Sequence, residues 1–217
     1  MTDSNTEKYY SARAAEYEQI YYRDNPERRK EIDDEVTRLK ELVTGHDVLE
    51  LACGTGYWTQ AMSQTAHLIT AIDVSSEMLD EARKKSYGCP VDFIPGDMFG
   101  HDYGRRFDVL VIGFWFSHQP RQEYPRLFDL MRGLITDHGR FWLIDNNPPA
   151  EGPHQHSVRK DEHGNNFKKR FLDNGTEFVI LKNYFTEDEL RKIFTTEFGV
   201  ESLIYGTYYW STVLKSR

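Results

Sequence analysis

The sequence of 217 residues is short of cysteine and has no long apolar run. Its two cysteines, Cys53 and Cys89, form neither a CxxC pair nor a metal-ligand pattern, so no disulfide framework, zinc site or other metal is expected. No apolar run approaches the roughly 20 residues of a membrane-spanning helix, and the N-terminus lacks the basic and apolar regions of a signal peptide. We therefore expect a cytoplasmic protein without membrane contact.

An excess of positive charge is also missing. Lysine and arginine number 27 against 35 acidic residues, which gives a net charge of −8. A chain with this balance repels a nucleic-acid backbone unless a basic patch compensates. The longest basic cluster, Lys168 to Arg170, is followed at once by Phe171 and Leu172. Nucleic acid is therefore not an expected partner.

The length predicts one domain, either a monomer or a homodimer. After an expected first helix near residues 7–22 and a second that starts with Asn25 as N-cap and Pro26, apolar runs alternate with helical stretches. This alternation is typical of an α/β fold with a parallel sheet. The expected strands cover residues 47–51, 68–73, 91–94, 107–115 and 141–144.

The alternation of apolar runs and helical stretches ends after Pro149. Residues 150–167 are polar and rich in histidine, and Asn174-Gly175 between apolar runs predicts a hairpin. A helix over 186–198 and two aromatic-rich strands within 200–214 are expected to follow. The expected organisation is an N-terminal helical lid (1–44), a cofactor-binding core (45–149), a substrate lid insert (150–184) and a C-terminal helix with a strand hairpin (185–217).

A glycine turn carries the strongest chemical signal. The segment VLELACGTGYWT places Glu50 near the end of an apolar run and Gly54 and Gly56 at the junction with the next helix. Glycines there let a ligand approach the backbone. Asp73 ends the following apolar run, where a carboxylate can accept hydrogen bonds from a ribose diol. Thr59 stands where a dinucleotide site has its third glycine, which favours S-adenosylmethionine (SAM) over a nicotinamide dinucleotide.

Several segments in order resemble the class I SAM-dependent methyltransferases. ELACGTG, AIDVSSEML and GDMF resemble the first three motifs, and FDVLVIGFWFSHQP and DHGRFWLIDN resemble the fourth and fifth strand segments. Within the class, the chain is similar to a group of bacterial small-molecule methyltransferases. The resemblance implies a Rossmann-like seven-stranded sheet with helices on both faces, an N-terminal helical lid and a hairpin lid inserted after strand 5. It also implies SAM as the cofactor and S-adenosylhomocysteine (SAH) as the product.

The resemblance further assigns residues to the cofactor. Glu50 and the turn meet its methionine end, Asp73 its ribose and Asp97 its adenine, and an N-terminal helix closes over it. The expected cofactor-binding residues are Tyr9, Arg13, Tyr17, Glu50, Ala52, Gly54, Gly56, Asp73, Val74, Asp97, Met98 and Phe114. Two structural alternatives stay open, because acids can cap helix N-termini and tyrosines at helical spacing often pack in a core.

His118 follows the fourth apolar run and is the expected catalytic residue. The ordinary pKa of histidine, about 6.5, suits proton removal near neutral pH. Its place beyond the apolar run means that it need not be a core histidine, although it could instead cap the helix that follows Pro120 or merely pack over the pocket. Trp115, Arg170 and Tyr184 are the other residues expected to contact the substrate.

The expected function is therefore transfer of the methyl group of SAM to an oxygen or nitrogen of a small molecule, an aromatic compound or secondary metabolite being one class of acceptor. Two alternatives remain. A nicotinamide-dependent oxidoreductase would bind a dinucleotide, and a non-catalytic SAM-binding module would bind SAM without forming a product.

Overall fold

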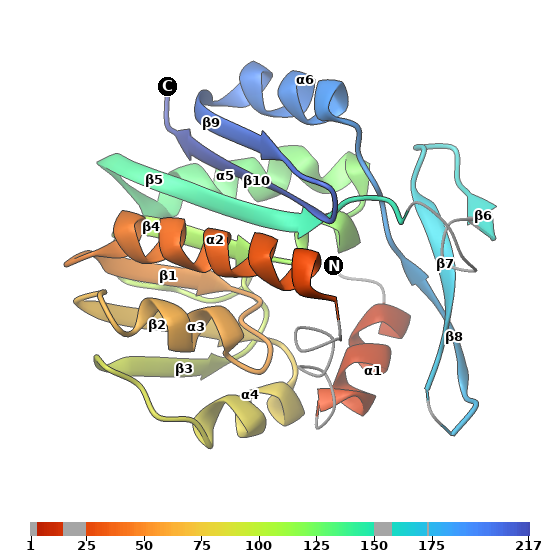
Figure 1. Cartoon of the computed structure of the whole chain (residues 1–217), viewed down its shortest axis with the longest axis horizontal. Coiled ribbons are helices and arrows are strands. Elements are labelled where there is room, and N and C mark those ends of the chain that lie inside the picture. Colours follow the sequence, from red (N-terminus) through yellow and green to blue (C-terminus); the bar gives the residue numbers. More distant parts are fainter. Residues whose placement is uncertain (1–3, 15–24, 150–157, 173) are drawn as a thin grey trace.

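The computed structural model describes residues 4–14, 25–149, 158–172 and 174–217. Its centre is a seven-stranded sheet with the order β3-β2-β1-β4-β5-β10-β9 (Figure 1). Strands β1 to β5 are parallel, and β10 runs antiparallel to both β5 and β9. The strands of this sheet are β1 (Asp47–Leu51), β2 (Leu68–Asp73), β3 (Val91–Pro95), β4 (Phe107–Gly113), β5 (Ile135–Asn146), β9 (Gly199–Tyr205) and β10 (Tyr209–Lys215).

Helices cover both faces of the sheet, with α2 and α3 in front of it and α5 behind it in Figure 1. This arrangement confirms the expected Rossmann-like fold class. None of the described helices combines the length and the apolar composition needed to cross a membrane. The helices are α1 (Ser4–Ala12), α2 (Pro26–Val43), α3 (Tyr57–Met62), α4 (Ser76–Arg83), α5 (Tyr124–Leu134) and α6 (Glu187–Glu197).

The alternation of side chains along the strands explains why both faces are covered. On β4, Leu110 and Ile112 pack into the hydrophobic cluster that includes α5 and α6. Val109 and Val111 on the same strand pack into the cluster under α2 and α3. A strand buried on both faces has an almost continuous apolar sequence, which is why this run was readable as a central strand.

The start of α2 is as predicted. The Asn25 side chain accepts a hydrogen bond from the Arg28 backbone N–H at 2.9 Å, and Pro26 occupies the first helical position. The fourth strand of the sheet ends earlier than predicted. Its predicted end at residue 115 is wrong, because β4 ends at Gly113. Phe114 adopts a left-handed backbone conformation with φ of 57° and turns the chain out of the sheet.

A small antiparallel sheet follows β5, as the family resemblance implied. It consists of β6 (Arg159–Lys160), β7 (Asn166–Phe171) and β8 (Glu177–Leu181), and its β7–β8 pair is the predicted hairpin. Figure 1 shows this sheet beside α1, near the edge where the parallel strands end. The rings of Tyr9 on α1 and Phe178 on β8 are 5.7 Å apart, so helix and hairpin pack together.

Candidate functional site

A pocket of about 340 Å³ opens at the carboxyl ends of β1 and β4, where the strand order changes direction. Ligands of open α/β sheets bind at such switch points. The volume lies within the range of small-molecule sites, roughly 300–1,000 Å³. The pocket is lined by Thr6, Glu7, Tyr10, Ala52, Cys53, Gly54, Thr55, Tyr57, Trp58, Ile72, Asp73, Val74, Ser75, Met78, Gly96, Asp97, Met98, Phe99, Gly113, Phe114, Trp115 and His118.

The two positions of the turn need glycine for different structural reasons. Gly54 has φ of 55°, and a Cβ atom there would meet nothing within 4 Å, so its backbone faces open space in the pocket. Gly56 has φ of 76°, and a Cβ atom there would lie 2.8 Å from the Tyr87 hydroxyl and 3.1 Å from the Ala82 Cβ. Gly56 therefore lets the start of α3 pack on α4, and it does not line the pocket.

Asp73 ties the end of β2 to the glycine turn. Its carboxylate accepts hydrogen bonds from the backbone N–H of Gly54 at 2.8 Å and of Ser75 at 2.9 Å. Burial raises the pKa of Asp73, although these backbone hydrogen bonds act in the opposite direction. Asp73 therefore lines the pocket and also fixes the adjacent loop, and its binding of a ribose stays a prediction.

Glu50 lies beneath the pocket rather than on its wall. Its side chain is 1% exposed and accepts a hydrogen bond from the Thr59 hydroxyl at 2.5 Å. Burial raises the pKa of Glu50 to about 8. Thr59, which replaces the third glycine of a dinucleotide motif, is the partner of this acid inside the fold.

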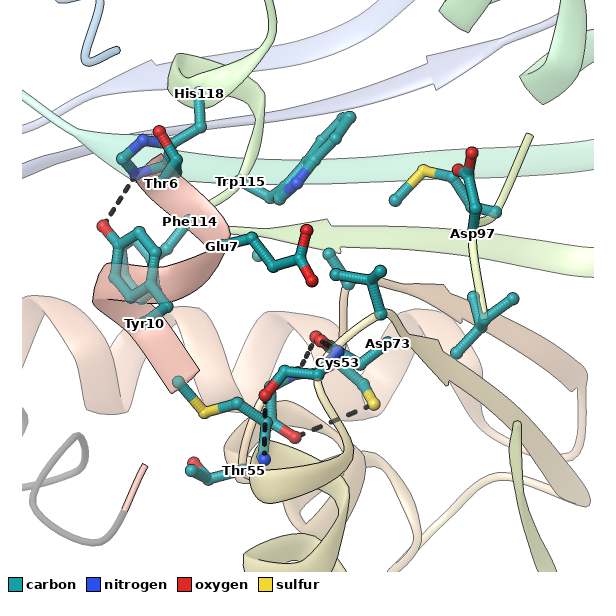
Figure 2. Close-up of a pocket in the computed structure, with 18 of the residues that line it drawn as sticks. Thr6, Glu7, Tyr10, Cys53, Thr55, Asp73, Asp97, Phe114, Trp115 and His118 are labelled. Carbon is teal, nitrogen blue, oxygen red and sulfur yellow. Dashed lines mark hydrogen bonds between the residues drawn. The ribbon is translucent and has the colours of Figure 1, made fainter. Parts of the chain in front are cut away.

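The residues expected at adenine form part of the pocket lining. Val74, Asp97 and Met98 line the pocket together with Phe99. In Figure 2, Asp97 lies on the opposite side of the pocket from Tyr10. Val74 is 48% exposed although its side chain is apolar, so a ligand that covered it would bury apolar surface.

Backbone strain is concentrated in the pocket wall. Among the described non-glycine residues, Ala52 and Phe114 alone have positive φ angles, of 56° and 57°. They follow the neighbouring strands β1 and β4, and both line the pocket. Such conformations each cost of the order of 1–3 kcal/mol and cluster at functional sites.

His118 is buried, with 1% of the residue exposed, a point that its place beyond the fourth apolar run had left open. The short helical turn Phe116–His118 folds the chain back over the sheet and places His118 in the pocket wall. Its Nε2 lies 2.8 Å from the hydroxyl of Tyr10, and its Nδ1 lies 2.6 Å from the carbonyl oxygen of Leu181. Burial lowers the pKa of His118 to about 3, and the charge of Lys182 acts in the same direction.

A buried ion pair supports this turn from behind. Lys182 Nζ lies 2.8 Å from a carboxylate oxygen of Asp145 and donates to the Ser117 hydroxyl at 2.6 Å. The other oxygen of Asp145 accepts from the Ser117 backbone N–H at 2.9 Å. The turn is thereby connected to the end of β5 and to the residue that follows β8.

Two of the N-terminal residues expected at the cofactor, Tyr9 and Arg13, lie outside the pocket lining. Tyr9 is 3% exposed and faces Phe178, and Arg13 donates to the Tyr9 hydroxyl at 2.8 Å. Neither residue lines the pocket, which favours the alternative that they pack the helix in place. Tyr17 lies outside the described residues.

The expected acceptor residues divide into two groups. Trp115 and His118 line the pocket, whereas Arg170 and Tyr184 do not. Arg170 lies on β7 and Tyr184 follows β8, where the Lys168 Nζ is 5.3 Å from the centre of the Tyr184 ring.

Sequence reasoning missed the three side chains that α1 contributes to the pocket, Thr6, Glu7 and Tyr10. Figure 2 shows them on one side of that helix, with Thr6 and Tyr10 near His118. The three- and four-residue spacing was a usable signal, because residues so spaced share a helix face. The prediction instead followed the tyrosine stripe, whose member Tyr9 packs against the hairpin.

Comparisons with known proteins find similarity to methyltransferases. The family described as "Methyltransferase domain" matches residues 48–139. The structure of DhpI in complex with SAH is 26% identical, with a TM-score of 0.79 over 98% of this chain and 96% of that one. The DhpI complex with SAM and HEP is 27% identical, with a TM-score of 0.77 over 97% and 96%.

Among curated proteins, the cypemycin N-terminal methyltransferase of a Streptomyces species is 28% identical over 110 residues, 49% of this chain. The matched part is 44% of that relative, so this chain spans less than half of its length. The segment shared with the methyltransferase family contains Gly54, Asp73 and Gly113 of β4, which all line the pocket. Residues 48–139 therefore match the methyltransferase domain family, and almost the whole chain shares the fold of the DhpI structures.

Proposed function

We propose that the protein transfers the methyl group of SAM to an oxygen or nitrogen of a small-molecule acceptor and leaves SAH. The observation that carries this proposal is the pocket beside the glycine turn, where Gly54 leaves open space against its backbone and Asp73 forms part of the wall. The similarity over almost the whole chain to DhpI bound to SAH, and to SAM and HEP, supports it.

The residues present fit SAM. Ala52, Gly54 and Asp73 would hold the methionine and ribose parts, and Val74, Asp97 and Met98 the adenine. Phe114 would lie beside the cofactor. Glu50 and Gly56 would act from behind the wall by fixing the turn, and Tyr9 and Arg13 by fixing α1 on the hairpin.

SAM supplies a methyl group that its sulfonium has already activated, so the protein mainly has to orient the acceptor and exclude water. In the transfer, a lone pair of the acceptor oxygen or nitrogen forms the new bond to carbon. The carbon–sulfur bond breaks, its electron pair stays on sulfur, and the acceptor's proton is released to water. Helix α1 covers one side of the pocket and brings Glu7 toward its centre (Figure 2).

The acceptor belongs at the end of the pocket nearest α1, against Trp115 and His118. We assign residues 1–44 and 150–184 as lids over the core of 45–149, with 185–217 completing the sheet, and we assign Arg170 and Tyr184 of the second lid to acceptor choice. A catalytic base at His118, as expected from the sequence, stays the alternative to the positioning role argued below, and the pH–rate profile of His118→Gln distinguishes the two. Both cysteines, Cys53 and Cys89, are free thiols, which supports the proposed cytoplasmic location.

The test combines binding with product detection. Calorimetric titrations with SAM, SAH and NADH are expected to show micromolar binding of the first two, about −8 kcal/mol, and no binding of NADH. Incubation with isotopically labelled SAM and a metabolite library, followed by mass spectrometry, is expected to reveal a labelled acceptor. Binding of NADH alone would favour an oxidoreductase, and SAM binding without any product would favour a non-catalytic module.

A further inference from the structure

The hydrogen bonds of His118 determine which of its nitrogens carries the proton. Nδ1 lies 2.6 Å from the carbonyl oxygen of Leu181, and a carbonyl oxygen can only accept. Nδ1 is therefore the protonated nitrogen. Since burial holds the pKa of His118 at about 3, the ring is neutral at physiological pH and Nε2 keeps its lone pair.

This tautomer also determines the direction of the bond to α1. Nε2 can only accept, so the Tyr10 hydroxyl, 2.8 Å away, donates its hydrogen to it. The two rings meet edge to face with their centres 5.1 Å apart. With its hydrogen committed to His118, the Tyr10 oxygen can only accept a hydrogen bond from any further partner.

A second polar group lies one turn earlier on the same helix. Thr6 is four residues before Tyr10, is 2% exposed and lines the pocket. Its hydroxyl has no hydrogen-bond partner among the described residues. A buried hydroxyl without a partner costs about 1–3 kcal/mol, a cost that a ligand in the pocket would remove.

Charged side chains of one sign line the pocket, whereas the charges of Lys182 and Arg170 act on His118 without lining the pocket. Its described lining contains the carboxylates of Glu7, Asp73 and Asp97, and no lysine or arginine. In Figure 2, Glu7 extends from α1 toward the middle of the pocket. Since Asp73 and Asp97 are assigned to the cofactor, a negatively charged acceptor would meet the carboxylate of Glu7 and the accepting oxygen of Tyr10.

We propose that Thr6 and Tyr10, with Tyr10 oriented by His118, form the acceptor subsite, and that this subsite selects nucleophiles that carry a hydrogen, namely hydroxyl and amino groups, over carboxylates and other oxyanions. The inference rests on the proposed methyl transfer. Tyr10 accepts the hydrogen bond of the nucleophile and so directs its lone pair toward the methyl group. His118 is a positioning residue that acts through Tyr10.

The first test uses labelled SAM and acceptors in matched pairs, each pair sharing a carbon skeleton that ends either in an alcohol or amine or in a carboxylate or phosphate. Labelled methyl ethers or methylamines support the proposal. Methyl esters of the oxyanions as main products overturn it. Absence of every product would count against the proposed function, and the nitrogen resonances of His118 then decide the inference separately.

Those resonances are recorded on ¹⁵N-histidine protein saturated with SAH, without turnover. A protonated Nδ1 and an unprotonated Nε2 that shifts in Tyr10→Phe support the geometry. A protonated Nε2, or no response to Tyr10→Phe, overturns it.

Substitutions give a third readout. Tyr10→Phe is expected to lower kcat/KM for the acceptor by about tenfold, as loss of one hydrogen bond of about 1.4 kcal/mol requires, with SAM affinity changed less than twofold. Thr6→Val is expected to raise the KM of the acceptor. A catalytic base makes the rate fall at low pH, which gives the pH–rate profile an acidic limb. Because His118 acts through Tyr10 and not as a base, the profile of His118→Gln is expected to keep the acidic limb of the wild type. An equal loss of SAM affinity in Tyr10→Phe, or disappearance of the limb in His118→Gln, would overturn the assignment.

Tyr205→Phe is the matched control. Its hydroxyl donates to the Phe185 carbonyl at 2.8 Å, and the residue lies outside the pocket lining. The substitution removes one tyrosine hydroxyl and one hydrogen bond of the same length, and kcat/KM is expected to change less than twofold. A loss equal to that of Tyr10→Phe would show that the effect is not specific to the subsite.

Discussion

The ion pair of Lys182 and Asp145 lies behind the pocket, and its loss should be costly. Their side chains are 7% and 0% exposed, and they lie 2.8 Å apart. Lys182→Met keeps most of the side-chain volume but leaves the carboxylate buried with only the backbone N–H groups of Ser117 and Asn146 and the Asn146 amide as donors. Breaking a buried pair from one side typically costs about 3–5 kcal/mol.

That loss is a large part of the stability of a typical domain, about 5–15 kcal/mol. With a shift of about 2–4 °C per kcal/mol for a chain of this size, the melting temperature of Lys182→Met should fall by about 6–20 °C. The assay is chemical denaturation followed by circular dichroism, with linear extrapolation to water. The exposed pair of Lys169 and Glu177, also 2.8 Å apart, is the control, and Lys169→Met should cost no more than about 1 kcal/mol.

The stability lost in Lys182→Met should depend on pH, because the pKa of Asp145 depends on Lys182. Burial alone would raise the pKa of Asp145, but Lys182 and its hydrogen bonds lower it overall. A lowered pKa stabilises the fold above the unfolded value of about 3.9, and the stability is lost as the pH falls through the folded value. In Lys182→Met the pKa of Asp145 should rise, so the difference from the wild type should shrink between pH 7 and pH 4. A loss under 1 kcal/mol, or one independent of pH, would refute the reasoning. Adding Asp145→Asn should recover part of the loss, because no unpaired charge remains.

Three further changes test the site. Asp73→Ala should weaken SAM and SAH by roughly 1.5–3 kcal/mol in calorimetry, and unchanged affinities in a folded variant would remove Asp73 from the site. Because the pKa of Glu50 is raised to about 8, the wild type should lose stability between pH 5 and pH 8 through this group, and Glu50→Gln should not. Equal pH slopes of the unfolding free energy in the two proteins would contradict this. Gly113→Ala should destabilise by about 1–3 kcal/mol, because its Cβ would lie 2.4 Å from Trp58, whereas Gly133→Ala, with nothing within 4 Å, should not destabilise the fold. Similar unfolding midpoints for the two alanine variants would refute the packing argument.

Local signals were sufficient for most of the fold. The apolar run of β4, the cap at Asn25 and the glycine turn each depend on residues within one element or one junction. Such features follow from backbone geometry and hydrophobic alternation, which are readable along the chain. The same holds for the part of the pocket built by Gly54 and Asp73, because consecutive parallel strands end at one edge of the sheet.

The boundaries that failed depend on contacts between distant segments. The end of β4 is set by Phe114, whose backbone N–H donates to the Ile144 carbonyl at 2.8 Å. That bond exists only once β4 and β5 are paired, so no local pattern could reveal it. The burial of His118 could not be predicted for a related reason, since the segments that bury it, α1 and β8, are distant in sequence.

The sequence by itself determined the class of the fold, the place of the glycine turn and the acid that follows β2, because these arise from short-range periodicity and from residues with special backbone freedom. Only the tertiary structure decided that Thr6 and Tyr10 enter the pocket while Tyr9 packs on the hairpin, and that Glu50 lies beneath the wall. The helical period of 3.6 residues states which side chains share a face, but not which face meets the pocket. That choice is made by the packing of α1 against β8, which brings together residues more than a hundred positions apart.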